Sequence, residues 1–262
     1  MQKKIISCPY FSLASFNINS AIKVDRKSKN AGHEGLDSAK YIPEYTQSLA
    51  NNLKFYNFDI LCLQEVVSGP YNQAKALAEY LDYPYFSQFA MSDNHNVKGA
   101  LMGNLTLSRY PILEEKGVLG YKPAVISMPE GWTVQDKGLL STKIILPTGI
   151  ININNVHLLS TYHFEFSSKE WKKMWSSLNQ KLQKNTQQSV CIGDFNHSPE
   201  IIEKNIPQFR KVFNYIKTAE THYSHRTLDH LYVSSDIAVT DVKIIDNEYS
   251  DHFILAGELK IN

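Results

Sequence analysis

Acidic, amide and imidazole side chains stand at the ends of several apolar, strand-like segments of this sequence. Each of them alone is more often a turn former or a cap than a catalytic group. Because strand ends in layered folds converge and line clefts, we expect these side chains to meet at one place. They are Asn17, Glu65, His157, Asp194, Asn196, Asp229, Asp251 and His252.

Two carboxylates in this set suit a divalent cation and the activation of water. Glu65 ends the apolar segment 59–64 and offers hard oxygen ligands of the kind that Mg²⁺ prefers, with Mn²⁺ as the alternative ion. Asp194 directly follows the apolar segment 189–193 and can orient or deprotonate a water molecule. The pair therefore predicts a metal-assisted hydrolytic site.

The remaining polar groups suit a phosphoester substrate. Asn196 can donate its amide to a phosphoryl oxygen without adding a negative charge beside the anion. His157 and His252 can stabilise a pentavalent oxyanion or protonate a leaving group. A neighbouring aspartate would fix the tautomer of an imidazole and favour its cationic form, and both Asp229 and Asp251 are candidates for that part.

Strands and a few helices must position these side chains. Helical periodicity marks segments 42–56, 74–81 and 171–182, whose apolar residues recur every three or four positions. Segments rich in β-branched and aromatic residues and bounded by turn formers predict strands at 11–18, 58–64, 85–89, 101–108, 139–146, 150–157, 189–193, 228–233, 242–245 and 253–259. Many strands with helices between some of them predict an α/β fold in which two sheets are layered together and covered by helices.

The third helical segment admits two interpretations. Ser167 and Glu170 form a possible capping box before it, and its apolar stripe favours packing on a sheet. Lysines flank its two tryptophans, however, so a helix lying on a membrane surface is the alternative. Trp132 and Tyr121, in a segment without periodicity, either pack within a loop, stack a base or enter a lipid surface.

Three further groups of polar residues also have a second interpretation. His222 and His225 are spaced as two zinc ligands could be, but no cysteine or third ligand completes a tetrahedron, which favours contact with substrate or solvent. Arg109, at a strand end, either reaches a phosphate or forms a structural ion pair. The polar loop 24–36 carries a basic cluster that could border the cleft and touch a phosphate.

Composition narrows the protein class. The 262 residues carry 27 Lys and Arg against 26 Asp and Glu, a net charge of +1, so non-specific coating of nucleic acid is disfavoured and any such binding must be local. No apolar run approaches the roughly 20 residues that span a bilayer. No linker or repeat divides residues 1–262, which predicts one domain, and we expect a monomer. The polar interruptions near the N-terminus argue against a signal peptide, which predicts a cytoplasmic location unless secretion uses another signal.

Seven short motifs occur in order along the chain: 63–66 (LQEV), 103–111 (GNLTLSRYP), 136–140 (DKGLL), 155–158 (NVHL), 193–196 (GDFN), 226–230 (RTLDH) and 250–252 (SDH). Together they resemble the motifs of the endonuclease/exonuclease/phosphatase superfamily, whose fold is deoxyribonuclease-I-like. The resemblance implies a four-layered α/β sandwich. Two central sheets, mixed or antiparallel, would be flanked by helices, with an Mg²⁺-dependent phosphoester hydrolase site between them.

The same resemblance assigns roles to the metal-side residues. It puts Glu65 on the metal, with Asn17 and Asp251 as direct or water-mediated ligands. Asp194 becomes the group that activates water, and Asn196 anchors the phosphate.

It also implies that His157, oriented by Asp229, clamps the scissile phosphate together with His252. Where many relatives have a tyrosine after the aspartate of the sixth motif, this chain has His230. That residue either tunes metal affinity or packs in the strand, and we favour packing.

These observations predict an Mg²⁺-dependent hydrolase that cleaves phosphoester bonds by direct attack of water. A nuclease-like phosphodiesterase acting on nucleic acid is slightly favoured by the local basic residues. The near-neutral charge keeps a phospholipid or sphingomyelin phosphodiesterase and an inositol-phosphate phosphatase open. An inactive binding module with the same fold is the alternative of another class, and it is disfavoured because every expected polar position is occupied.

Overall fold

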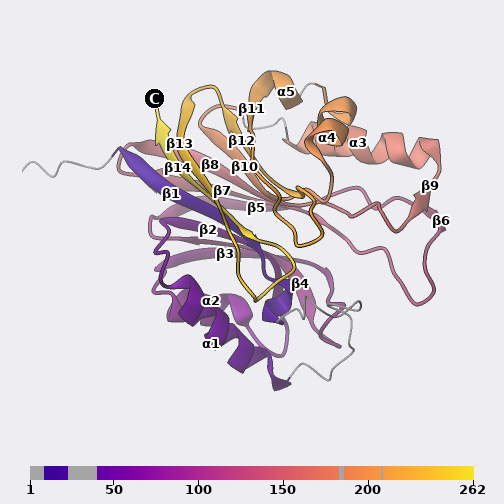
Figure 1. The fold of residues 1–262 in the computed structure, drawn as a ribbon, viewed down its shortest axis with the longest axis horizontal. Coiled ribbons are helices and arrows are strands. Elements are labelled where there is room, and N and C mark those ends of the chain that lie inside the picture. The colour runs from indigo at the N-terminus through magenta and orange to yellow at the C-terminus, as the bar shows by residue number, and fades with distance from the viewer. Residues whose placement is uncertain (1–8, 23–39, 183–185, 208) are drawn as a thin grey trace, which may run out of the picture.

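The computed structural model describes residues 9–22, 40–182, 186–207 and 209–262. The polar loop 24–36 singled out above lies outside these residues, so its expected contact with a phosphate stays a prediction. Figure 1 shows two β-sheets at the centre of the molecule, with helices on both outer sides.

Each of the two large sheets has six strands and is mixed. The first has the order β13-β14-β1-β2-β4-β3, and the second has the order β11-β12-β10-β8-β7-β5. The strands of the first sheet are β1 (Tyr10–Asn17), β2 (Ile60–Ser68), β3 (Tyr85–Asp93), β4 (Leu101–Ser108), β13 (Ile237–Ile245) and β14 (Ile254–Ile261). Those of the second are β5 (Ile112–Leu119), β7 (Gly138–Leu146), β8 (Gly149–His157), β10 (Ser189–Asp194), β11 (Phe213–Ile216) and β12 (Asp229–Ser234). One pair in each sheet is parallel, β1 with β2 and β8 with β10.

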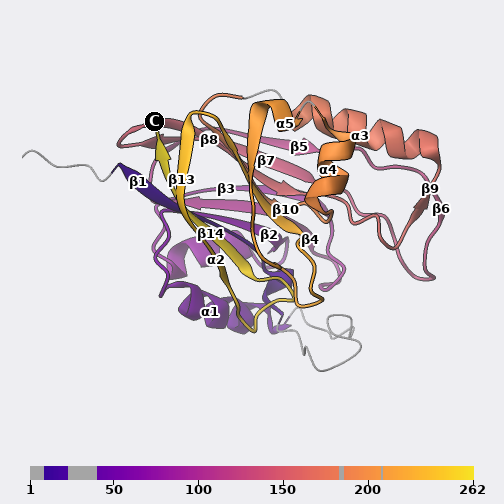
Figure 2. The ribbon, with the colours of Figure 1, turned by 45° about the horizontal axis from the view of Figure 1, so that its top comes forward.

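The helices flank this pair of sheets, with α1 and α2 on the side of the first sheet and α3, α4 and α5 on the side of the second, as two views agree (Figures 1 and 2). They are the 3₁₀ turn η1 (Asn19–Ala21) and the α-helices α1 (Ile42–Leu53), α2 (Gln73–Tyr80), α3 (Ser168–Leu182), α4 (Pro199–Asn205) and α5 (Phe209–Val212). A small two-stranded sheet, β6 (Val125–Ser127) with β9 (Glu165–Phe166), lies beside the start of α3.

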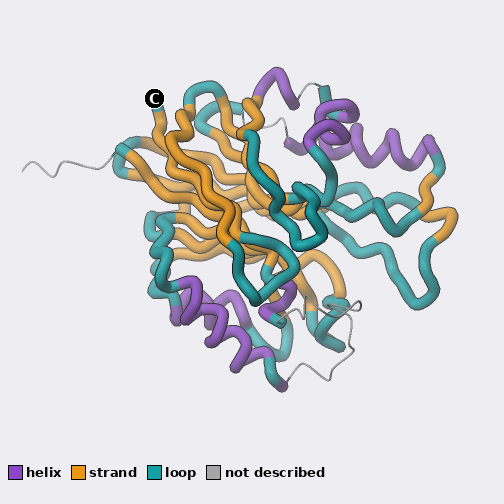
Figure 3. Tube along the Cα trace, in the orientation of Figure 1, coloured by secondary structure: helices purple, strands orange, loops and turns teal. Residues whose placement is uncertain are grey.

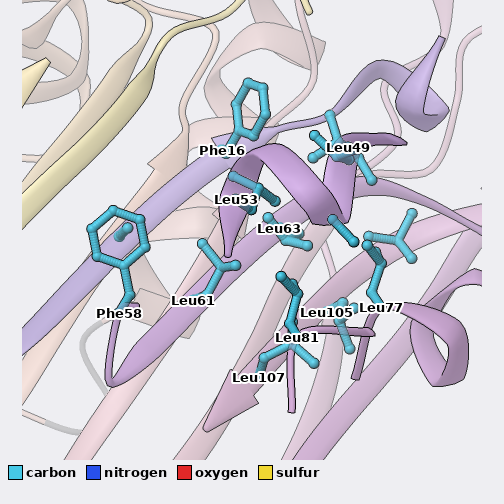
Figure 4. Packing of buried hydrophobic residues seen from close by; sticks show 14 of the residues in the cluster. Phe16, Leu49, Leu53, Phe58, Leu61, Leu63, Leu77, Leu81, Leu105 and Leu107 are labelled. Carbon is cyan, nitrogen blue, oxygen red and sulfur yellow. The ribbon is translucent and has the colours of Figure 1, made fainter. Parts of the chain in front are cut away.

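Three of the four apolar clusters in the described residues hold the layers together. Leucines of β2 and β4 pack against α1 and α2 in the first (Figure 4). The second lies between the sheets and joins side chains such as Leu13 and Ile60 to Ile153 and Val190. The third lies between the second sheet and the helices α3 to α5. Central strands are therefore buried on both faces, which is why their sequences are continuously apolar.

The predicted elements are confirmed, with the boundaries shifted by a few residues. All ten predicted strands and all three predicted helices are present. Strands β5, β6, β9 and β11 were not predicted. β5 is a mostly exposed edge strand rich in charges, and β6, β9 and β11 have only two to four residues each.

The apolar stripe of helix α3 packs on the second sheet, as the periodicity predicted. Met174, Trp175 and Leu178 are buried in the third cluster. Ser167 accepts a hydrogen bond from the Glu170 amide at 3.2 Å, as in a capping box. No helix in the described part of the chain is long and apolar enough to cross a membrane.

Candidate active site

Three of the predicted site residues form one row across the second sheet. Asp194, at the end of β10, is paired in register with His157 on β8 and with Asp229 on β12. Gly193 makes the close approach possible: its φ is +143°, and a Cβ there would lie 2.1 Å from the Val156 carbonyl oxygen. The strand pairing alone thus brings an imidazole and two carboxylates together.

The first sheet contributes Asn17 and Glu65, and a β-bulge is what turns Glu65 toward the site. Ile60 and Cys62 face the second sheet, whereas Leu61 and Leu63 face the helices. By this alternation Glu65 would point toward α1 and α2. The register between β2 and β4 shifts between Leu63 and Val66, and Glu65 has a φ of +59°. The bulge therefore redirects its carboxylate.

Four polar side chains, three from distant segments and one from Asn196 two residues along the chain, converge on one oxygen of Asp194. Its Oδ2 lies 3.1 Å from Asn17 Nδ2, 3.0 Å from Asn196 Nδ2, 3.5 Å from His157 Nε2 and 3.7 Å from His252 Nε2. Asp194 and both imidazoles are buried. Asn17 Nδ2 also donates to Glu65 Oε1 at 3.3 Å, which links the metal-side residues to this centre.

The Asp229 carboxylate pairs with His252 and not with His157, so the partner that the resemblance implied is wrong. His252 Nδ1 donates to Asp229 Oδ2 at 2.8 Å. His157 instead directs Nε2 toward Glu65 Oε1, at 3.8 Å, and toward Asp194. His157 ends β8 and its side chain faces the first sheet, whereas His252 comes from the loop before β14, which approaches the head of β12.

The loops before β12 and β14 lie side by side (Figure 3), joined by a β-bridge between His222 and His252. His222 Nδ1 accepts a hydrogen bond from the Ser224 amide, so Nε2 carries the proton that faces Asp251 Oδ2 at 3.3 Å. His225, by contrast, pairs with Glu220. The two imidazoles thus engage different carboxylates, which does not favour a shared zinc ion.

Two basic side chains at the site were not predicted from the sequence. Lys137 Nζ lies 3.7 Å from Glu65 Oε1, and its side chain is only 8% exposed. His95 Nε2 lies 3.6 Å from Glu65 Oε2. Lys137 stands within the third of the seven motifs, which was a usable signal, whereas nothing in the sequence around His95 points to the site.

Burial and neighbouring charges set the protonation of the centre. Burial holds the pKa of His157 well below its usual value, so this imidazole is neutral. Burial also acts to lower the pKa of His252, but Asp229 and Asp194 outweigh it and hold that pKa well above the usual value. Burial raises the pKa of the Asp194 carboxyl despite the opposing effect of His252. The centre therefore pairs one neutral imidazole with one cationic imidazole around a carboxyl group.

Comparison with known proteins identifies the family. The sequence matches the endonuclease/exonuclease/phosphatase family over residues 14–252. The chain belongs to this family. No curated protein sequence matches it significantly.

Solved structures share the deoxyribonuclease-I-like sandwich fold. An endonuclease/exonuclease/phosphatase from Beutenbergia cavernae superimposes with a TM-score of 0.70 at 17% identity, covering 97% of this chain and 72% of the other. The human Nocturnin catalytic domain gives 0.67 at 19% identity, covering 98% and 95%. A Staphylococcus aureus beta toxin with bound magnesium ions gives 0.57 at 13% identity, covering 96% and 99%. Family members are hydrolases that act on phosphoesters, generally with a divalent metal.

The donor groups of this chain fit a hard divalent cation. Burial acts to raise the pKa of Glu65, but Lys137 and His95 outweigh it and keep the carboxylate ionised, with 12% of the side chain exposed. Burial likewise opposes ionisation of Asp251, yet the hydrogen bond from His222 lowers its pKa well below the usual value. Two ionised, accessible carboxylates are the ligands that Mg²⁺ takes together with water. In the described residues, His222, Asp251 and His252 form one cluster that could hold a metal ion, and Asp194, Asp229 and His252 form another; Glu65 belongs to neither.

Two other residues singled out from the sequence have structural contacts. Arg109 donates from Nε to the Phe58 carbonyl oxygen at 3.1 Å, and its guanidinium lies 5.0 Å from the centre of the Tyr83 ring. His230 is fully buried, and its Nε2 donates to the His197 carbonyl oxygen at 2.7 Å. Packing, the favoured interpretation of His230, is thus confirmed.

Proposed function

We propose that this protein is an Mg²⁺-dependent hydrolase that cleaves phosphoester bonds by direct attack of water, most simply a nuclease-like phosphodiesterase. The observation that carries the proposal is the convergence on Asp194 Oδ2 of two amides and two imidazoles, each within 3.7 Å. A carboxylate surrounded in this way can accept a proton while the surrounding N–H groups contact an anion.

Asp194 takes the proton of the attacking water in this scheme. The raised pKa of the Asp194 carboxyl lies closer to neutral pH, so its carboxylate form is a stronger base than an ordinary carboxylate and accepts a proton from water more readily. As the water oxygen bonds to phosphorus, the bond from phosphorus to the leaving oxygen breaks. Cationic His252 supplies a proton to that oxygen from Nε2, while Asp229 holds the ring through Nδ1.

Asn196 and neutral His157 contact the phosphoryl oxygens. Asn196 has a φ of +53°, and its Nδ2 donates to the Leu158 carbonyl oxygen at 3.0 Å, so its amide is fixed before substrate arrives. Glu65, Asp251 and Asn17 would hold Mg²⁺, which when bound neutralises charge on the phosphoryl oxygens. Asn17 turns Nδ2 toward the two carboxylates and accepts the Asn19 amide on Oδ1, so its contact with an ion is best mediated by water.

A lipid phosphodiester is the second candidate substrate, and one observation favours it. The segment around β6 and the loop before β9 expose large apolar side chains: Ile126 is 64% exposed, Trp132 38% and Tyr162 77%. The Arg226 guanidinium lies 5.5 Å from the centre of the Tyr162 ring. Arg226 belongs to the loop that also carries His222. Exposed apolar groups on segments that reach, through Tyr162, the loop carrying His222 suit a substrate held in a lipid surface.

The test is hydrolysis of a chromogenic phosphodiester by the purified chain with Mg²⁺, with Mn²⁺ and with EDTA. We expect turnover with metal, loss with EDTA and recovery when Mg²⁺ is restored. Absence of turnover under all three conditions would favour an inactive binding module. A panel of DNA, RNA, sphingomyelin and phosphoinositides with Mg²⁺ then separates the nuclease-like candidate from the lipid candidates.

A further inference from the structure

The buried side-chain amide of Asn155, in the second sheet, hydrogen-bonds the first sheet close to the active site. Asn155 belongs to β8, two residues before His157, and continues the face on which Ile151 and Ile153 pack between the sheets. Its side chain is fully buried. Where its apolar neighbours meet apolar partners, Asn155 meets polar groups of β2 and β4.

Every hydrogen-bonding group of this amide has a partner across the gap. Nδ2 donates to the carbonyl oxygens of Leu63 at 3.1 Å and Leu105 at 2.9 Å, and Oδ1 accepts from Gln64 Nε2 at 2.8 Å. The Asn155 carbonyl oxygen in turn accepts from Asn104 Nδ2 at 2.8 Å. Because every polar group of its own side chain is paired in a buried position, the orientation of the Asn155 amide is strongly fixed.

The position of these bonds coincides with the bulge that aims Glu65. Leu63 and Leu105 are the last register pair of β2 and β4 before the shift, and Glu65 follows two residues later. Asn155 therefore hydrogen-bonds β2 directly before the bulge, where the alternation of side chains between the two faces of the strand is interrupted. Its own strand carries His157, whose Nε2 lies 3.8 Å from Glu65 Oε1.

We propose that Asn155 is a positioning residue that clasps the β2 bulge and so holds the Glu65 carboxylate in register with His157 and Asp194. The inference rests on the proposed function, in which Glu65 is a metal ligand. Loss of the clasp lets the bulge relax, so the site binds Mg²⁺ more weakly although no ligand has been removed. Groups that orient ligands in this way typically change metal affinity by about 10- to 100-fold.

The neighbouring residue supplies a matched control. Asn154 is also a buried asparagine of β8, and its Nδ2 also donates to a main-chain carbonyl oxygen, that of Val190 at 3.2 Å. It faces the opposite side of the sheet, where it bonds Ser141 and Ser189. Asn154→Leu and Asn155→Leu thus remove comparable bonds from adjacent positions, and only the second touches the bulge.

Mg²⁺ binding by titration calorimetry, and the rise in melting temperature that Mg²⁺ produces, test the inference. We expect Asn155→Leu to raise the Kd for Mg²⁺ by about 10-fold or more, with excess Mg²⁺ restoring part of the hydrolysis rate, and Asn154→Leu to leave the Kd unchanged. Of the Asn155 hydrogen bonds, Gln64→Met removes only the one to Oδ1, together with the bond from Gln64 Nε2 to Ser15 Oγ at 3.0 Å. It should give an intermediate Kd, and this variant tests the inference if Asn155→Leu does not fold.

The outcomes separate the two claims. Wild-type protein that binds no Mg²⁺ would overturn the proposed function and this inference with it. Wild-type protein that binds Mg²⁺ while Asn155→Leu, or Gln64→Met in its place, binds equally tightly would overturn the clasp alone. Equal weakening by Asn154→Leu would do the same, since it would trace the effect to general destabilisation.

Discussion

Two neighbouring regions of the molecule bury imidazoles in opposite charge states. At the active site, His252 is 5% exposed and donates to the Asp229 carboxylate at 2.8 Å. In the neighbouring region, His230 is fully buried and donates to a main-chain carbonyl oxygen at 2.7 Å. The pKa of His252 lies well above the usual value, whereas burial lowers that of His230 to about 4. The two imidazoles are buried to a similar extent, so the charge of the hydrogen-bond acceptor, a carboxylate for His252 and a neutral carbonyl for His230, decides the protonation state.

Asp229 and His230 are adjacent on β12, and their side chains point to opposite faces of the strand. One face serves the reacting centre, and the other packs against Phe195 and Tyr215. A one-residue step along a strand thus separates chemistry from packing. Variants on the two faces should therefore affect different measurements, rate on one and stability on the other.

The largest effects on rate are expected from the carboxyl group and the cationic imidazole at the centre. Asp194→Ala and His252→Ala should each lower the rate of phosphodiester hydrolysis by at least about 100-fold, because each removes a proton-transfer group. The measurement is kcat on a chromogenic diester at saturating Mg²⁺, with circular dichroism to verify the fold.

A carboxylate remote from the centre controls for general destabilisation. Asp59 Oδ2 accepts from the Ser12 amide at 2.8 Å and from its hydroxyl at 2.9 Å, directly before the start of β2, whereas Glu65 lies within that strand. Asp59→Ala should lower the melting temperature and leave kcat within about 3-fold of wild type. Retained activity in Asp194→Ala or His252→Ala would remove that residue from its assigned role.

A smaller loss of rate is expected when Asp229 keeps its shape but loses its charge. Asp229→Asn preserves a hydrogen-bond acceptor for His252 Nδ1 but no longer favours the imidazolium, so kcat should fall by about 10-fold or more. Hydrolysis by Asp229→Asn and by Asp229→Ala gives the comparison. Equal kcat in Asp229→Asn and wild type would show that orientation alone, and not charge, is what Asp229 supplies.

The packed imidazoles should make stability depend on pH. Burial lowers the pKa of both His230 and His197 from 6.5 to about 4, so the unfolded chain takes up protons first as the pH falls. The contribution of each of these two imidazoles to the free energy of unfolding is therefore fully present above pH 6.5 and is lost toward pH 4, by up to about 3 kcal/mol each.

Urea unfolding of wild type and His230→Phe at pH 7, 5.5 and 4.5 checks this. His230→Phe should be less stable at pH 7, by about 1–3 kcal/mol, because the His197 carbonyl oxygen loses its donor. Its stability should decline less steeply with falling pH, by about 1 kcal/mol per pH unit. Parallel pH profiles for the two proteins would show that His230 is not buried in its neutral form.

Much of this architecture could be predicted from the sequence, because the apolar pattern of a strand and the polar residues that end it are both local features of the chain. Central strands such as β2 and β10 are buried on both faces, so their residues are continuously apolar, and the eight polar site positions stand where those runs end. Strand β5 escaped prediction because an exposed edge needs no such pattern.

The details that could not be predicted depend on side-chain direction. Both Asp229 and Asp251 were candidates to orient an imidazole, and only the packing of two loops decides that Asp229 meets His252 and Asp251 meets His222. The left-handed turn at Glu65 reverses the direction expected from alternation along β2. The contact of Lys137 with Glu65 joins elements far apart in the chain.

The smallest effect is expected at an exposed histidine whose ion pair is as short as that of His252. His225 Nδ1 lies 2.8 Å from Glu220 Oε2, with side chains 84% and 55% exposed. Water screens such a pair, so His225→Ala should change the free energy of unfolding by less than about 0.5 kcal/mol and leave kcat unchanged. His222→Ala, three residues earlier, removes a buried partner of Asp251 and should lower kcat clearly. Parallel kinetics and urea unfolding of the two variants give the comparison, and an equal loss of rate in both would indicate that the two imidazoles act together, as a shared zinc site requires.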